Sequence, residues 1–278
     1  MRALNLGCGR RIHADWENVD FAASAPGVRA YDLRKGIPYP DASFDVVYHS
    51  HLLEHFSKQS APGFLLECHR VLKPGGILRV AVPDLEGIAR AYLEALSKAS
   101  EAQPGWEANY DWMVLELYDQ AVREESGGAC SDFYRQQPIP NWDFVYQRVG
   151  AEAKAALAAF QPKTAPAVDD SRRIPSKWQF VVRNFGSVLR NRLAKAVLSS
   201  RDYQALQVGL FRRQGEIHLW MYDSYSLARL LKDAGFANPQ RCSATQSRIL
   251  DWAAFCLDME PDGSTYKPDS LFMETVKP

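Results

Sequence analysis

Two short apolar segments separated by one helical segment most constrain how this chain can fold. Residues 44–50 (FDVVYHS) and 77–83 (ILRVAVP) are short, rich in β-branched and aromatic residues, and bounded by Gly, Pro or Asp, as strands are. Between them, the Ser-Ala-Pro at 60–62 supplies an N-cap and a first-turn proline, and apolar residues then recur at helical spacing as far as the Lys-Pro-Gly-Gly at 73–76. This order predicts a parallel crossover unit, and therefore a sheet covered by helices.

Other short segments with the same strand character lie towards both ends of the sequence. They cover residues 3–6, 16–20, 28–33, 238–244 and 253–258. Two further helices are predicted: one runs from Asp84 to Leu96, and the other covers 222–236, with Asp223 as a capping residue and Gly235 as its stop. Together these elements predict an α/β fold with a Rossmann-like, mostly parallel sheet and helices on both faces.

Residues 97–213 interrupt this alternation. We therefore divide the chain into a core of residues 1–96 and 214–278 and a mainly helical insertion over 97–213, which includes an alanine-rich helix near 151–160. The insertion is rich in aromatic residues, namely Tyr110, Trp112, Phe133, Tyr134, Trp142, Phe144 and Tyr146. Such rings suit stacking on the sugar faces or bases of a bound acceptor, and they equally suit the apolar core of a helical lid.

Charge and cysteine content exclude several classes of protein. Lys plus Arg and Asp plus Glu both number 33, so no specific nucleic-acid partner is expected. The five cysteines are scattered without a Cys-x-x-Cys pair, which argues against a disulfide framework or a zinc knuckle. No apolar run reaches the roughly 18 residues of a membrane span, and no secretory signal is evident. A cytoplasmic protein is expected, and no sequence feature indicates its oligomeric state.

The glycine turn after the first predicted strand indicates which nucleotide the sheet binds. A dinucleotide-binding turn has a third glycine, where this chain has Ile12, and an acid about 20 residues further on, whereas Asp20 comes only eleven residues after Gly9. With so short a connection there is no full helix whose dipole would hold a pyrophosphate. Gly7, Gly9, Asp20 and Asp32 instead suit a nucleoside without phosphates, such as S-adenosylmethionine, at the carboxyl ends of three strands.

Four motifs in this order resemble the class I S-adenosylmethionine-dependent methyltransferases. They are LNLGCG, WENVD, YDLRKGIPYPDASFDVVYHSHLLEHF and ECHRVLKPGGILRVAVPDL. The resemblance covers residues 1–93 and 216–278 and is strongest to a short subgroup that begins almost at the glycine motif and is associated with surface-polysaccharide biosynthesis. Because a chain of this kind has no N-terminal helix to close over the cofactor, we expect the insertion after Leu96 to form the lid.

The resemblance implies a cofactor, S-adenosylmethionine, and a set of residues that hold it. Gly7 and Gly9 would contact the cofactor, Asp20 would bind the ribose hydroxyls, Asp32 would approach the adenine, and Leu33 would line the adenine pocket. The predicted cofactor site also includes three neighbouring residues, namely Cys8, Phe21 and Ser50. The side chain of Cys8 is expected to turn into the packing of the turn.

Candidate catalytic residues cluster in YHSHLLEHF and recur after the insertion. A sulfonium is already an activated methyl donor, so a base is needed only if the acceptor is a hydroxyl or similar group. His51, at the carboxyl edge of its strand, is the preferred base or orienting group, and His218 is a second candidate. Glu54 is expected to support one of them. His55 follows His51 by four residues, but no third metal ligand is evident, so no metal site is predicted.

A basic segment precedes the last predicted helix. Residues 171–214 contain ten Lys or Arg and a single acid, Asp202. This excess suits attraction of a phosphorylated acceptor, such as a nucleotide sugar or lipid-linked saccharide, or peripheral docking of residues 172–213 on an anionic membrane. A solvated helix face balanced by acids elsewhere explains it equally well.

The sequence therefore predicts a methyltransferase that O-methylates a small-molecule or saccharide acceptor. Two alternatives remain open. One is a regulatory protein that binds S-adenosylmethionine without catalysis. The other is a nucleotide-dependent oxidoreductase or epimerase of the same sheet type, because one fold can host several chemistries.

Overall fold

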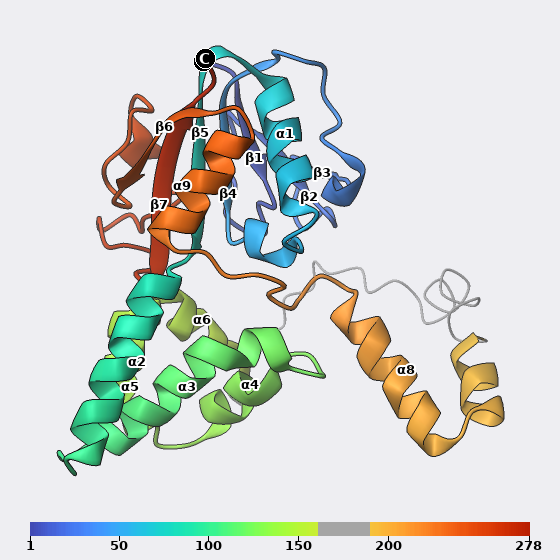
Figure 1. Cartoon of the computed structure of the whole chain (residues 1–278), viewed down its shortest axis with the longest axis vertical. Coiled ribbons are helices and arrows are strands. Elements are labelled where there is room, and N and C mark those ends of the chain that lie inside the picture. Colours follow the sequence, from blue (N-terminus) through green and yellow to red (C-terminus); the bar gives the residue numbers. More distant parts are fainter. Residues whose placement is uncertain (161–189) are drawn as a thin grey trace, which may run out of the picture.

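A seven-stranded sheet forms the centre of the computed structural model, which describes residues 1–160 and 190–278 (Figure 1). The strands are β1 (Ala3–Leu6), β2 (Glu17–Asp20), β3 (Val28–Ala30), β4 (Phe44–Ser50), β5 (Leu72–Pro83), β6 (Ala237–Cys242) and β7 (Ser270–Val276). Their order is β3-β2-β1-β4-β5-β7-β6. The first five strands pair in parallel, and β7 runs antiparallel to both of its neighbours. This confirms the predicted mostly parallel sheet, with the 3-2-1-4-5 order of doubly wound nucleotide-binding folds.

Two helices cover one face of this sheet, and aromatic side chains cover the other. Helices α1 (Ala61–Val71) and α9 (Ser224–Asp233) pack on the first face through an apolar core that includes Phe64 and Leu231 (Figure 1). On the second face Trp16 and Trp252 pack beside Tyr48, and Trp252 begins the short 3-10 helix η3 (Trp252–Phe255). Alternate residues of the strands therefore serve different cores.

Most predicted elements of the core agree with the structure. Strand β4 and helix α6 (Ala151–Phe160) have the predicted bounds, and the side chain of Asp223 accepts a hydrogen bond from the backbone of Ser226 in a capping box of α9. The third strand was predicted to end at residue 33, but it ends at Ala30. Leu33 instead begins the 3-10 helix η1 (Leu33–Lys35).

One expectation about strands is wrong, and one strand was not predicted. Residues 253–258 do not form a strand, because Trp252–Phe255 wind into η3 and bury Trp252 against the sheet. The strand that completes the sheet is β7, over Ser270–Val276, which the sequence analysis did not identify. The Lys-Pro-Gly-Gly at 73–76 ends α1 as predicted but already belongs to β5, since Gly75 and Gly76 exchange backbone hydrogen bonds with Lys277.

A second group of helices packs at the carboxyl ends of the parallel strands (Figure 1). It contains α2 (Leu85–Ser100), α3 (Trp106–Val122), α4 (Gly128–Arg135), α5 (Trp142–Val149) and α6. These helices share an apolar core that includes Ile88 and Ala95 of α2. Because α2 continues to Ser100, the predicted boundary after residue 96 falls inside a helix.

Helix α8 (Ser200–Arg212) follows residues 190–197, which are also helical, and lies apart from the sheet (Figure 1). Residues 161–171 of the insertion and four residues of the basic segment, Arg172, Arg173, Lys177 and Arg183, lie outside the described residues. Within the described ranges, no helix combines the length and the hydrophobicity that a membrane span requires.

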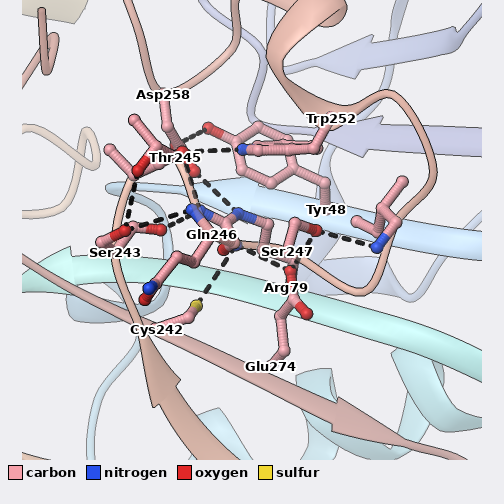
Figure 2. A network of polar contacts seen from close by, with 12 residues as sticks. Tyr48, Arg79, Cys242, Ser243, Thr245, Gln246, Ser247, Trp252, Asp258 and Glu274 are labelled. Atoms are coloured by element: carbon pink, nitrogen blue, oxygen red, sulfur yellow. Dashed lines mark hydrogen bonds and ion pairs between the residues drawn. The ribbon is translucent and has the colours of Figure 1, made fainter.

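A buried network of charged groups joins the sheet to the loop that precedes β7 (Figure 2). The Arg79 side chain on β5 is fully buried, and its Nε and Nη1 lie 2.8 and 2.7 Å from carboxylate oxygens of Asp258 and Glu274. The hydroxyl of Tyr48 donates to Asp258 at 2.6 Å, and Arg79 Nη2 donates to the carbonyl of Ser243 at 2.9 Å. One guanidinium therefore holds two strands and a long loop together.

Candidate functional site

The turn after β1 needs glycine at both predicted positions. Gly7 and Gly9 have φ values of +65° and +53°, in the left-handed region that side chains disfavour. The Gly7 amide donates to the carbonyl of Val19 at 2.8 Å, and the Gly9 amide donates to Asp20 Oδ2, also at 2.8 Å. A Cβ atom at Gly7 would lie 2.9 Å from Leu52. The turn is thus tied to the end of β2 and lies tightly against the segment after β4.

The turn opens into a first cavity of about 960 Å³. Its lining includes six residues predicted for the site: Gly7, Asp20, Phe21, Asp32, Leu33 and His51. Residues of α1, among them Phe64, form one wall, and the segment after α8, including Arg213 and Leu219, forms another. Residues from both sides of the insertion therefore enclose the cavity.

Three residues predicted for the cofactor site do not line this cavity. Gly9 contributes indirectly, because its amide donates a hydrogen bond to the carboxylate of Asp20, which does line the cavity. The Cys8 side chain is buried, and burial raises the pKa of its thiol to about 11, so the thiol stays neutral within the packing of the turn. Ser50 shares its face of β4 with Tyr48, because alternate strand residues point the same way, and this is the face opposite His49.

Two carboxylates of the first cavity stand at the ends of neighbouring strands. Asp20 ends β2, and Asp32 follows β3. Asp32 accepts hydrogen bonds from Arg34 Nε and Nη2 at 2.8 and 3.0 Å, and these bonds lower the pKa of its carboxyl group. Each carboxylate keeps lone pairs that can accept from hydroxyl or amino groups of a ligand.

A second cavity, of about 470 Å³, lies between the sheet and the helical group. Its lining includes His51, His55 and His218, together with Trp112 and Tyr134 of the insertion. His51 and His55 also line the first cavity, so the two cavities meet at these imidazoles. The fold thereby brings together both predicted catalytic residues, which are far apart in the sequence.

His51 is held in an uncommon backbone conformation. Its φ is +49°, which is rare for a residue other than glycine, and its amide donates to the carbonyl of Ala81 at 2.9 Å. The ring lies between two partners: Nε2 is 2.8 Å from the hydroxyl of Ser270, and Nδ1 is 3.4 Å from Glu54 Oε1. Backbone and side chain are thus both fixed where the cavities meet, as is common at functional sites.

Glu54 is a buried carboxylate among three histidines. It lies in the 3-10 helix η2 (Leu53–His55), and its side chain is fully buried. Burial by itself raises the pKa of this carboxyl group, but its interaction with His51 and the proximity of His218 and His55 outweigh burial and lower the pKa to about 2. His218 Nε2 lies 3.9 Å from Glu54 Oε1, and burial lowers the pKa of His218 to about 3, so this imidazole is uncharged near neutral pH.

Several charged residues of the second cavity were not predicted from the sequence, among them Glu152, Lys267 and Asp269. Lys267 Nζ and Glu152 Oε2 form an ion pair at 2.7 Å, and burial raises the pKa of the neighbouring Asp269 to about 6. Lys267 and Asp269 come just before β7. Because β7 is antiparallel, its first residue lies at the edge where the parallel strands end. The strand pattern of Ser270–Val276 was the signal in the sequence that could have placed Lys267 and Asp269 at this edge of the sheet.

The aromatic residues of the insertion serve mainly as its core. Trp112, Phe133 and Tyr134 are buried against one another, while Tyr110, Trp142 and Phe144 pack around this cluster. Trp112 and Tyr134 have a second role, because they also form part of the wall of the second cavity. The interpretation as the core of the helical group is therefore confirmed, and stacking on an acceptor stays a prediction for the two residues of the cavity wall.

Comparison with known proteins identifies similar sequences over part of the chain. Residues 10–80 match the family described as a methyltransferase domain. A protein of Mycolicibacterium smegmatis, described as a probable S-adenosylmethionine-dependent methyltransferase, is 37% identical over 98 residues, which cover 29% of this chain and 37% of that protein. The match thus spans little more than a third of the relative's own length.

Solved structures with similar regions include two S-adenosylmethionine-dependent methyltransferases. The one from Archaeoglobus fulgidus is 22% identical and covers 33% of this chain and 50% of that chain, with a TM-score of 0.27. The one from Mesorhizobium loti is 24% identical and covers 31% and 48%, with a TM-score of 0.26.

Proposed function

We propose that this chain, which carries a class I S-adenosylmethionine-dependent methyltransferase domain, transfers a methyl group from that cofactor to an oxygen atom of a small-molecule or saccharide acceptor. The observation that carries the proposal is the position of His51, which lines both cavities. A nucleoside in the first cavity and an acceptor in the second would meet at this imidazole. Such a juxtaposition is what transfer between two bound molecules requires.

The first cavity fits the cofactor in its hydrogen-bond acceptors and in the helix that the glycine turn lacks. Asp20 offers an acceptor for the ribose hydroxyls, Asp32 offers one for the adenine amine, and Leu33 supplies an apolar wall. Residues 7–16, all of them described, contain no helix, so the glycine turn does not lead into a helix N-terminus that would hold a pyrophosphate. When bound, the cofactor supplies an activated methyl group on its sulfonium.

His51 is suited to take the proton of an acceptor hydroxyl. A proton on Nδ1, which faces Glu54, leaves the lone pair on Nε2, where the hydroxyl of Ser270 now donates. A hydroxyl of an acceptor in the second cavity would take the place of this hydroxyl. Glu54 fixes the tautomer and stabilises the imidazolium that forms, while His218 is held beside the same carboxylate.

The walls of the second cavity favour a polyhydroxylated acceptor. Glu152, Lys267 and Asp269 present charged hydrogen-bonding groups, and Trp112 and Tyr134 present ring faces and polar tips. Carbohydrates combine polar edges with apolar ring faces, which such a lining can contact together. The helical insertion accordingly acts as the acceptor-binding lid of the core.

The described part of the basic segment supports an acceptor that carries a phosphate. Arg212 donates hydrogen bonds to the carbonyls of Arg123 and Ala121, and both Arg212 and Arg213 line the first cavity. The remaining described basic residues of the segment, Arg190, Arg192, Lys195 and Arg201, lie on exposed helices. They would attract a nucleotide sugar, or a lipid-linked saccharide at an anionic membrane surface.

All five cysteines are free thiols, which suits the reducing cytoplasm.

Two substitutions separate binding from turnover. Asp20→Ala removes the ribose acceptor and should weaken S-adenosylhomocysteine binding, measured by calorimetry, by about thirtyfold, or about 2 kcal/mol. His51→Ala should leave this affinity within about twofold and lower transfer of labelled methyl to nucleotide sugars by about a hundredfold or more. Asp143→Ala, on the exposed side of α5, is the matched control.

The same measurements address the two alternatives. Cofactor binding without transfer of label to any acceptor, by the unmodified chain, would favour the regulatory protein. Tight binding of NAD with no binding of S-adenosylhomocysteine would favour the oxidoreductase or epimerase, and would refute the methyltransferase proposal.

A further inference from the structure

The carboxylate of Glu54 is unusual because it is fully buried with imidazoles close to it. Both of its oxygens are buried, and among the described residues neither has a hydrogen-bond partner. A buried charge without hydrogen bonds is costly, so such groups are normally paired or bound to a metal ion. The nearest polar groups are imidazoles of His51 and His218, at 3.4 and 3.9 Å from Oε1.

Three potential ligand atoms converge beside this carboxylate. One oxygen of Glu54 and one ring nitrogen from each of His55 and His218 all lie within 4.8 Å of one another. A single ion can reach three such atoms, because Zn–N and Zn–O bonds are about 2.0–2.2 Å long. The sequence offered no third ligand, since His218 lies on the other side of the insertion.

The orientation of His55 is that of a metal-binding histidine. Its Nδ1 lies 2.9 Å from the carbonyl oxygen of Ile217, so Nδ1 carries the proton and donates it. The other ring nitrogen, Nε2, then keeps its lone pair. A backbone carbonyl that fixes the tautomer in this way is the usual outer-shell partner of a metal-bound imidazole.

The backbone holds the three residues in place before any ion binds. The carbonyl of Glu54 accepts hydrogen bonds from the amides of Leu219 and Trp220 at 2.7 and 3.2 Å. The amide of His218 donates to the carbonyl of Gln120 at 2.9 Å, which ties the same segment to α3. The site is therefore assembled from two segments, and backbone hydrogen bonds link them to each other and to α3.

We propose that Glu54, His55 and His218 bind a divalent transition-metal ion of the zinc type. Two imidazoles and one carboxylate form a donor set that suits Zn²⁺ and also Fe²⁺ or Co²⁺, and three protein ligands leave further coordination positions open. His55 and His218 line the second cavity, so the open positions face the space assigned to the acceptor. A hydroxyl bound there would lose its proton more readily. Metal binding itself does not depend on the proposed methyl transfer.

The test is a metal titration of the full chain after treatment with a chelator. Co²⁺ should bind with one-to-one stoichiometry and give the visible absorption of a protein-bound ion, and Zn²⁺ should displace it. Glu54→Gln and His218→Ala should each weaken Co²⁺ binding by about a hundredfold, given that even outer-shell changes at metal sites cost about 10–100-fold. His69→Ala, which changes a histidine of α1 outside the cluster, should bind Co²⁺ as the unmodified chain does.

Folding and methyl transfer are read out separately. Circular dichroism and S-adenosylhomocysteine binding identify a variant that has merely unfolded, and Glu54→Gln, which keeps the side-chain volume, provides the second variant. Zn²⁺ should raise the Tm of the unmodified chain and leave that of Glu54→Gln unchanged. Absence of stoichiometric binding, or equal binding by both variants and the unmodified chain, would overturn the metal site. Metal binding by a chain that transfers no methyl group would support the site and count against the proposed function alone.

Discussion

At the start of β7, burial changes the acid–base behaviour of a single carboxyl group. Asp269 lines the second cavity, its Oδ1 is buried without a hydrogen bond among the described residues, and burial raises its pKa to about 6. In the unfolded chain an aspartate has a pKa of about 3.9. At a pH between these two pKa values, Asp269 holds a proton in the native state that it has released in the unfolded state. The free energy of unfolding contributed by this group therefore falls as the pH rises from about 4 to 6.

Asp269→Asn should remove this pH dependence. The variant should unfold with a free energy about 2 kcal/mol higher than that of the unmodified chain at pH 7, and with little difference near pH 4, because the neutral amide carries no ionisation cost. Urea unfolding at both pH values measures the effect. Asp262→Asn, in an exposed loop, makes the same charge change as a control. Equal differences at the two pH values would show that Asp269 is not the titrating group.

At the scale of elements, the Arg79 network couples β5 to β7 and to the loop over residues 243–258 (Figure 2). Arg79→Met keeps an apolar stem but leaves the buried carboxylates of Asp258 and Glu274 without their cation. We expect the free energy of unfolding to fall by about 3–5 kcal/mol, as when one partner of a buried ion pair is removed. Urea denaturation measures this loss.

Arg90→Met provides the matched control for this prediction. Arg90 pairs with Glu86 on the exposed face of α2, with Nη2 and Oε1 2.9 Å apart, and such surface pairs contribute about 0.5 kcal/mol or less. A loss from Arg79→Met no larger than that from Arg90→Met would mean that the network does not hold the loop on the sheet.

At the scale of the whole molecule, the first cavity joins the sheet, α1 and the segment after α8. A ligand that fills it binds only the folded chain, so S-adenosylhomocysteine at a hundred times its Kd should add about 2.7 kcal/mol to the free energy of unfolding. The Tm should rise by roughly 5–10 °C on the scale of 2–4 °C per kcal/mol. Differential scanning calorimetry checks this, with ATP and NAD as controls that carry phosphates. A larger shift with either control would contradict a phosphate-free nucleoside site.

Local patterns in the sequence determined much of the sheet, the glycine turn and the similarity of residues 10–80 to a methyltransferase domain. Alternation and helical spacing depend on neighbours a few residues apart, which is why β4, α1 and the cap of α9 were predicted correctly. Parallel strands end at one edge, so Gly7, Asp20, Asp32 and His51 could be expected to lie in one place, and in the structure they line one cavity.

Only the tertiary structure decided which side chains face one another across the insertion. It brought His218 to Glu54, placed Asp269 at the sheet edge through an antiparallel strand that the sequence analysis missed, and turned Cys8 and Ser50 away from the first cavity. The physical reason is that these positions depend on the packing of elements that are distant in the sequence. Such packing leaves no periodic pattern in the chain, whereas strands and helices do.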